Sequence, residues 1–591
     1  ATEEAKRVPA ALADAAMAGV FGRDRSVQGA NVGAVARAIW AARTKGVSEA
    51  KRVLAEGSHA EHLDAGLREL NYQGLHRLAD RTQSQTAATA LRKTGDAINF
   101  YGKAPFRALS AADRIFKAYH HQRALESAAW VQARQDAKAG LISADQIKAR
   151  AAEIVEAPPK WMDLEAKAYA EFATFNNPNL LAKGIGAAER TVVDGLRAEG
   201  SDTAAELVRL ASRTVLPFRN TPSNIITRIL WDYSGLKASK DLTQAAVSQF
   251  VNKTITSQQQ KAIAESVGRG AVGVGLAMLG YAMAQKGEAT PVYNNDRGEQ
   301  GVDEYAGRSQ GSIKIGGMWH RIINISPVGN LIGIGATMQH EANKGEATFG
   351  DRAMAVAGVG TRTVAELPMM QGTKEVVDFM QDPGKSAGSF ISSMAGSFVP
   401  TIASDAATLV DPTRREYKPG KQDNAIAYGV KYRMPFMRST LPAARDVLGD
   451  KLPASRLNAI NPLLSQPAKE DTDPLAARLK TDGAKIAKPT QKKNEDDAIF
   501  RARKYLQGVA VKRALQEALP ELDDRAKEIW GAARDKGVEM TPAEARAKAI
   551  SDITANTRRE VSTLTNAQNF RMLPPAEQAR IMQQFAESLS Q

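Results

Sequence analysis

The sequence predicts a mainly α-helical, multi-domain protein with a glycine-rich central module and one small β-hairpin. The chain has 591 residues, a length that accommodates roughly three to five domains. Aromatic residues make up only 6% of the chain while alanine is frequent, which favours helices packed through small side chains over sheets. Apolar residues recur every three or four positions in the first and last parts of the chain, as in amphipathic helices.

The composition excludes several classes of protein. The chain contains no cysteine, which excludes thiol catalysis, cysteine-ligated zinc, iron–sulfur clusters and disulfides. A mean hydropathy of −0.34 excludes a conventional membrane protein with many spans. The formal net charge is +14, which favours contact with anionic partners such as nucleic acid or lipid headgroups.

Residues 1–212 are predicted to form a helical bundle. Pro105 begins a helix whose apolar positions run as far as Trp130 and which stops at Gly140. The sequence Ser143-Ala-Asp-Gln146 has the spacing of a capping box and predicts the start of the next helix. Pro158 and Pro159 end that helix, because proline cannot continue the hydrogen-bond pattern.

The central module, residues 213–465, contains four glycine-rich apolar segments without charged residues: Gly270–Gln285, Ile322–Gln339, Ala353–Thr361 and Ser386–Ser404. Each is marginal for a membrane-spanning helix, which needs about 20 mostly apolar residues. Gly329 and Gly333 have GxxxG spacing and are predicted helix-packing residues, because this spacing lets helix backbones approach closely in lipid. Pro327 and Pro400 interrupt two of the segments, so buried hairpins of a soluble domain remain the competing interpretation.

Three further elements complete the predicted organisation. Between the first two apolar segments, Ser312–Ile322 alternates around Gly316-Gly317, as expected of a β-hairpin. Residues 466–497 are polar and rich in proline and charge, which predicts a linker. Residues 498–591 are predicted C-terminal charged helices, and Thr541-Pro-Ala-Glu544 and Leu573-Pro-Pro-Ala-Glu577 have the composition of helix N-termini.

Candidate catalytic and metal-binding motifs are incomplete, so no catalytic residue, cofactor or metal ligand is predicted. Ser309 lies in a G-x-S-x-G sequence, but neither the preceding strand nor the following helix of a nucleophile elbow is expected there. Glu126 precedes a serine, as does the general acid of lytic transglycosylases, but the rest of that motif is missing. His59 and His62 have no third ligand at a recognisable spacing.

Basic residues cluster between Pro412 and Asn458, where ten Lys and Arg accompany four acidic residues. Such density suits contact with the phosphates of DNA or of lipid headgroups, although a solvated loop face has the same composition. The candidate phosphate contacts are Arg414, Arg415, Lys418, Arg433 and Arg438.

Three stretches together resemble one known family. The first is Leu216-Pro-Phe-Arg-Asn-Thr-Pro-Ser-Asn-Ile-Ile, and the second is Gly270–Gly287 with the hairpin that follows. The third is Leu409-Val-Asp-Pro-Thr-Arg-Arg-Glu with Val430-Lys-Tyr-Arg-Met-Pro-Phe-Met-Arg-Ser-Thr-Leu-Pro. Their order and their sequences resemble a module found in internal virion proteins, or DNA ejection proteins, of short-tailed bacteriophages. The same module also occurs in large phage polyvalent proteins. The resemblance covers about Thr214 to Asp450, under half of the chain.

The resemblance implies a non-enzymatic helical virion protein that is packed inside the capsid and delivered ahead of the genome. Such proteins assemble in the host envelope, at the periplasm and inner membrane, as an oligomeric conduit for DNA. The implied partners are further copies of the chain in a ring or tube, other ejection or portal proteins, double-stranded DNA and the host envelope membrane. Some relatives carry a transglycosylase domain, whose motifs are missing here.

Two alternatives remain open. One is a structural internal core protein of the virion that stays with the portal and never enters a membrane. The other is a cell-wall hydrolase, of the lytic transglycosylase class, with an unrecognised site.

Cys-free helices with mostly local contacts suit a chain that must unfold and refold quickly during delivery.

Overall fold

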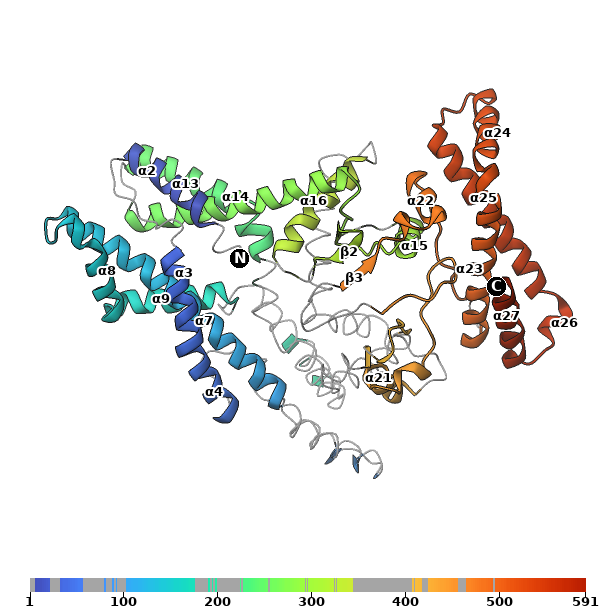
Figure 1. The fold of residues 1–591 in the computed structure, drawn as a ribbon, viewed down its shortest axis with the longest axis horizontal. Helices are drawn as coiled ribbons and strands as arrows, with labels where there is room; N and C mark the ends of the chain where they lie inside the picture. The colour runs from blue at the N-terminus through green and yellow to red at the C-terminus, as the bar shows by residue number, and fades with distance from the viewer. Residues whose placement is uncertain are drawn as a thin grey trace. The chain divides into compact units, whose positions relative to one another are not determined.

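A computed structural model shows a mainly α-helical chain with one small antiparallel sheet, which confirms the predicted fold class (Figure 1). The structure describes residues 6–21, 32–56, 103–175, 227–252, 256–292, 296–323, 327–343, 410–416, 424–454, 464–492 and 495–590, with isolated positions between these ranges. The chain divides into two compact units. In its described part, the first unit contains residues up to Gly280 and residues 325–335, and the second contains the others.

The first unit is built from helices. They are α2 (Arg7–Phe21), α3 (Val32–Ala41), the π-helical turn η1 (Ala42–Gly46), α4 (Val47–Glu56), α7 (Lys103–Lys138), the 3-10 turn η3 (Ala144–Gln146), α8 (Ile147–Glu156), α9 (Lys160–Ala173), the π-helical turn η4 (Arg228–Asp232), α13 (Leu236–Asn252) and most of α14 (Ser257–Gln285). The helices α3, α4, α8 and α9 all contact the long helix α7.

Small side chains form the core around α7. Ala129 and Ala133 of α7 are completely buried, and they cluster with Ile154 of α8 and Met162 of α9. Alanine allows these helices to pack closely at little cost in side-chain entropy. The predicted capping box at Ser143 is present, with the Ser143 amide donating to Gln146 Oε1 at 3.0 Å.

Glycines let α14 approach its neighbours at backbone distance. A β-carbon added at Gly273 would lie 1.8 Å from the carbonyl oxygen of Tyr233, beside η4. One added at Gly280 would lie 1.9 Å from the carbonyl oxygen of Ile332, in α16 (Val328–Asn343). One at Gly268 would lie 2.6 Å from the carbonyl oxygen of Lys6, at the start of α2. No other amino acid fits at these positions without displacing a backbone.

The second unit contains the sheet and the C-terminal helices. Its elements are α15 (Arg297–Tyr305), β1 (Ser312–Ile315), β2 (Met318–Arg321), the end of α16, α21 (Ala425–Arg433), the 3-10 turn η5 (Arg438–Thr440), β3 (Leu464–Pro467), the 3-10 turn η6 (Lys469–Asp471), α22 (Pro474–Thr481), α23 (Asp497–Ala518), the 3-10 turn η7 (Leu519–Glu521), α24 (Leu522–Asp535), α25 (Pro542–Thr565), α26 (Gln568–Arg571) and α27 (Pro575–Ser590). As predicted, a helix, α25, begins at Thr541-Pro-Ala-Glu544, and Thr541 and Glu544 form a capping box there.

The predicted hairpin is present, and a third strand extends it. Strands β1 and β2 pair antiparallel with Ile315 opposite Met318, and Gly316 and Gly317 form the turn at φ +58° and +73°. Positive φ at both positions matches the twist of a two-residue hairpin and favours glycine. Strand β3 then pairs antiparallel with β2.

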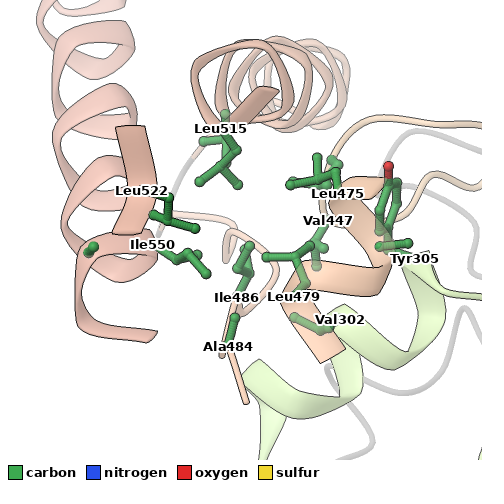
Figure 2. Close-up of a cluster of buried hydrophobic side chains, with 14 residues drawn as sticks. Val302, Tyr305, Val447, Leu475, Leu479, Ala484, Ile486, Leu515, Leu522 and Ile550 are labelled. Atoms are coloured by element: carbon green, nitrogen blue, oxygen red, sulfur yellow. The ribbon is translucent and has the colours of Figure 1, made fainter. Parts of the chain in front are cut away.

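The expected polar linker, residues 466–497, is instead part of a folded core, which corrects that expectation. Leu475 and Leu479 lie on one face of α22, and with Ile486 they are at most 2% exposed. Figure 2 shows these side chains between Val302 and Tyr305 of α15 and the helices that carry Leu515, Leu522 and Ile550. Burial of Leu475, Leu479 and Ile486 stabilises this stretch in the core despite its polar composition. The remaining predicted domain boundaries stay predictions.

Candidate phosphate-binding groove

Two of the five candidate phosphate contacts are already paired inside the fold. The Arg415 guanidinium donates to both Asp411 carboxylate oxygens, at 2.8 and 3.0 Å, and to the Leu441 carbonyl at 2.8 Å. This contact holds the pKa of Asp411 below its usual range. Arg438 is 5% exposed, lies 3.7 Å from the same carboxylate and stacks on Tyr432. These two arginines therefore fix their loop, and their assignment as phosphate contacts stays a prediction.

The other three candidates have different surroundings. The side chain of Arg414 is 55% exposed and donates to Glu304 at 3.3 Å. Arg433 is half-buried at the end of α21, and Lys418 lies outside the described residues. Of these three, Arg414 is therefore an exposed cation that is paired with a carboxylate.

A groove of about 290 Å³ lies beside this loop and is lined by cations from two distant parts of the sequence. Arg445 comes from the loop that precedes Gly449, whereas Arg501 and Lys504 come from α23. Glu416 is the one carboxylate among its lining residues. We call this site, defined by Arg445, Arg501, Lys504 and Glu416, the basic groove.

The described residues that line the groove include three cationic side chains and one carboxylate. Arg501 Nε lies 3.1 Å and Lys504 Nζ 3.7 Å from Glu416. The Arg445 guanidinium stacks on the Tyr505 ring at 3.5 Å and donates to the Gly449 carbonyl at 2.7 Å. An anion entering the groove would meet the Arg445 and Arg501 guanidinium groups, whose geometry suits phosphate oxygens.

The Lys504 side chain is only 16% exposed. Burial lowers the pKa of Lys504, the repulsion of Lys488 lowers it further, and Glu416 and Glu304 oppose these effects. Lys488 forms an ion pair with Glu304, the same carboxylate that Arg414 contacts. An incoming phosphate would favour the charged form of Lys504.

Sequence reasoning located the loop of this site but missed most of its cations. Arg501 and Lys504 lie in a helix whose charged residues look like those of any solvated face. Glu416 brings them to the loop, at a separation of 85 residues from Arg501. Nothing in the local sequence signals a pairing over that distance.

Of the four apolar segments of the central module, the two that the structure describes differ in how far their apolar side chains are exposed. Segment Gln259–Gln285 of α14 is long and apolar enough to cross a membrane by length and composition, with a mean hydropathy of 1.3 in its best window. It exposes Val274, Met278 and Leu279 by 46, 68 and 48%. In contrast, Leu331 and Ile332 of α16 are buried, as are Gly329 and Gly333. The segments Ala353–Thr361 and Ser386–Ser404 lie outside the described residues.

The incomplete catalytic motifs occupy ordinary structural contacts. Both Glu126 carboxylate oxygens accept hydrogen bonds from Arg37, at 3.0 and 2.8 Å. The Ser309 hydroxyl lies 2.9 Å from the Ser312 hydroxyl, and His320 contacts Ser465. Within the described ranges, no three potential ligands gather as a metal site would require, and His59 and His62 lie outside those ranges.

Comparisons with known proteins find no match to a family model, a curated protein or a solved structure.

Proposed function

We propose that the chain is an internal virion, or ejection, protein of a short-tailed phage. In this proposal it is delivered into the host envelope and oligomerises into a conduit through which the genome passes. The proposal starts from the sequence resemblance of residues 214–450. The single structural observation that carries it is the exposed apolar face of α14, a helix long enough to cross a bilayer.

Helix α14 has one face packed within the first unit and another face that is exposed and apolar. Its glycine face lies against η4 and α16, while Val274, Met278 and Leu279 are exposed and apolar. An exposed apolar helix face of this kind marks an interaction site in a water-soluble protein. A host membrane supplies an apolar partner for this face, and the basic groove supplies contacts for DNA phosphates or anionic headgroups.

The runner-up, a structural core protein that stays with the portal, is favoured by the burial of α16. Leu331, Ile332 and Ile334 are at most 9% exposed, so this second segment contributes to the fold without lipid. Electron microscopy of the purified chain with anionic liposomes separates the two roles. Rings or tubes on vesicles support the conduit, whereas dispersed protein that ignores lipid supports the internal role.

The membrane contact of α14 gives the first test. We expect Met278→Glu to weaken co-flotation with anionic liposomes by about tenfold or more, because a carboxylate is costly to place in the bilayer. Met278 is 68% exposed, so this change should leave the fold intact. Met572→Glu is the matched control, since Met572 is 73% exposed in the second unit. Equal flotation of both variants and the wild type would remove α14 from the membrane contact.

The basic groove gives the second test. We expect replacement of Arg445, Arg501 and Lys504 by Gln to reduce the slope of log affinity against log salt for duplex DNA by about 2.7, or about 0.9 for each lost phosphate contact. A matched triple variant replaces Arg513, Arg525 and Arg580, which are about half exposed and bind nearby glutamates. If the two triple variants show the same slope, the effect reflects net charge alone and the groove is not the contact.

A further inference from the structure

The turn between α21 and η5 holds a bulky side chain in a conformation that favours glycine. Phe436 has φ +64°, and the chain reverses there with the Arg438 amide donating to the Met434 carbonyl at 3.2 Å. For an L-residue with a large side chain, this left-handed region costs about 1–2 kcal/mol. Glycine or asparagine is the usual choice at such a position.

A second phenylalanine shows what normally offsets this cost. Phe175 also has φ +64°, but its ring lies 4.1 Å from the Arg228 guanidinium, and its carbonyl accepts a hydrogen bond from Asn224 at 2.8 Å. Phe436 is 76% exposed, more than any other large apolar side chain that the structure describes, and its neighbour Met437 is 45% exposed. Contacts among the described residues therefore explain Phe175 and do not explain Phe436.

The charge around this turn indicates the chemistry of its partner. Residues 424–444 contain three cations, Lys431, Arg433 and Arg438, and no acidic residue. Arg438 is turned toward Asp411, whereas Lys431 is exposed and Arg433 is half-buried. An aromatic residue and a methionine at a turn beside Lys431 and Arg433 match the interface of an anionic bilayer, which has phosphates at its surface and acyl chains beneath.

We infer that the turn Pro435–Met437 is an interfacial anchor for anionic lipid. Phe436 and Met437 enter the boundary between headgroups and acyl chains, and Lys431 and Arg433 contact lipid phosphates. The inference rests on the proposed membrane role and adds a contact separate from α14. The free energy gained by burying the Phe436 ring in lipid offsets the cost of its positive φ.

The absence of cysteine from the sequence permits a direct test. Phe436→Cys introduces a single thiol, which is labelled with an environment-sensitive fluorophore in the full chain. Vesicles containing phosphatidylglycerol should raise the emission and shift it to the blue, whereas phosphatidylcholine vesicles should have little effect. The same label on Leu141→Cys is the control, because Leu141 is 74% exposed in a turn of the first unit. An unchanged signal at position 436 on vesicle-bound protein would overturn the anchor.

A second variant separates loss of binding from loss of folding. Phe436→Gly should raise the melting temperature, because it relieves the strained φ, and should weaken partitioning to phosphatidylglycerol vesicles about tenfold or more. A lower melting temperature, or unchanged partitioning, would overturn the inference while leaving the proposed function intact. If the wild-type chain binds no vesicle, both fail. Loss of duplex DNA binding by Phe436→Gly, with vesicle binding retained, would assign the turn to nucleic acid and overturn its lipid role.

Discussion

Replacement of Gly273 or Gly280 by alanine is expected to lower the free energy of unfolding of the first unit by about 3 kcal/mol or more. The new methyl group would lie 1.8 Å from the Tyr233 carbonyl oxygen or 1.9 Å from the Ile332 carbonyl oxygen. Neither contact involves a side chain that can rotate away, so a helix or a turn has to move. Chemical denaturation followed by circular dichroism measures the effect.

The same helix contains its own control. A β-carbon added at Gly275 meets no atom within 4 Å. Gly275→Ala should therefore stabilise α14 by up to about 1 kcal/mol, through the higher helix propensity of alanine. Opposite signs for Gly275→Ala and Gly273→Ala would support the close contact with Tyr233. A stabilising effect at all three glycines would mean that α14 does not lie against these backbones.

Leu479→Ala is expected to destabilise the second unit by about 2–5 kcal/mol, because it leaves a cavity in a well-packed core. Leu479 is completely buried and clusters with Leu475, Ile486 and Val302. Thermal and denaturant unfolding measure the loss. The result also decides whether residues 466–497 are core or linker, since a leucine in a linker has no packing to lose.

Leu564→Ala is the matched control for this core substitution. Leu564 lies on α25 in the same unit and is 61% exposed. Its truncation should change the free energy of unfolding by no more than about 0.5 kcal/mol, as is usual for surface positions. Equal effects of the two substitutions would remove Leu479 from the core.

Local signals predicted local structure well. The hairpin at Gly316-Gly317, the capping box at Ser143 and the helix start at Thr541 all depend on a few adjacent residues, and all are present. The buried positions of α22 were missed because two leucines four residues apart are a weak signal amid proline and charge. Their burial depends on α15 and α23–α25, which are distant in sequence.

The candidate site divides in the same way. Composition located a basic loop, but it could not tell an arginine that binds Asp411 from one that faces solvent. That difference is set by tertiary pairing. Arg501 and Lys504 join the groove only because α23 folds onto the loop, so their role could not be read from the sequence. The family resemblance supplied the functional hypothesis, which neither composition nor spacing provides.

The glycine contacts of α14 also determine how its attraction to η4 and α16 changes as the helix moves away from them. Interdigitated side chains keep some contact as two helices separate. At a glycine, the two backbones touch directly and no side chain bridges the gap as it opens. Dispersion attraction is short-ranged, and a gap of 0.5–1 Å already loses about a quarter to a half of it. At Gly273 and Gly280, where α14 meets Tyr233 and Ile332 at backbone distance, a displacement of about 0.5–1 Å therefore removes about a quarter to a half of this attraction. If α14 leaves these contacts for a membrane, as proposed, its attraction to η4 and α16 should therefore fall steeply over the first ångström of movement.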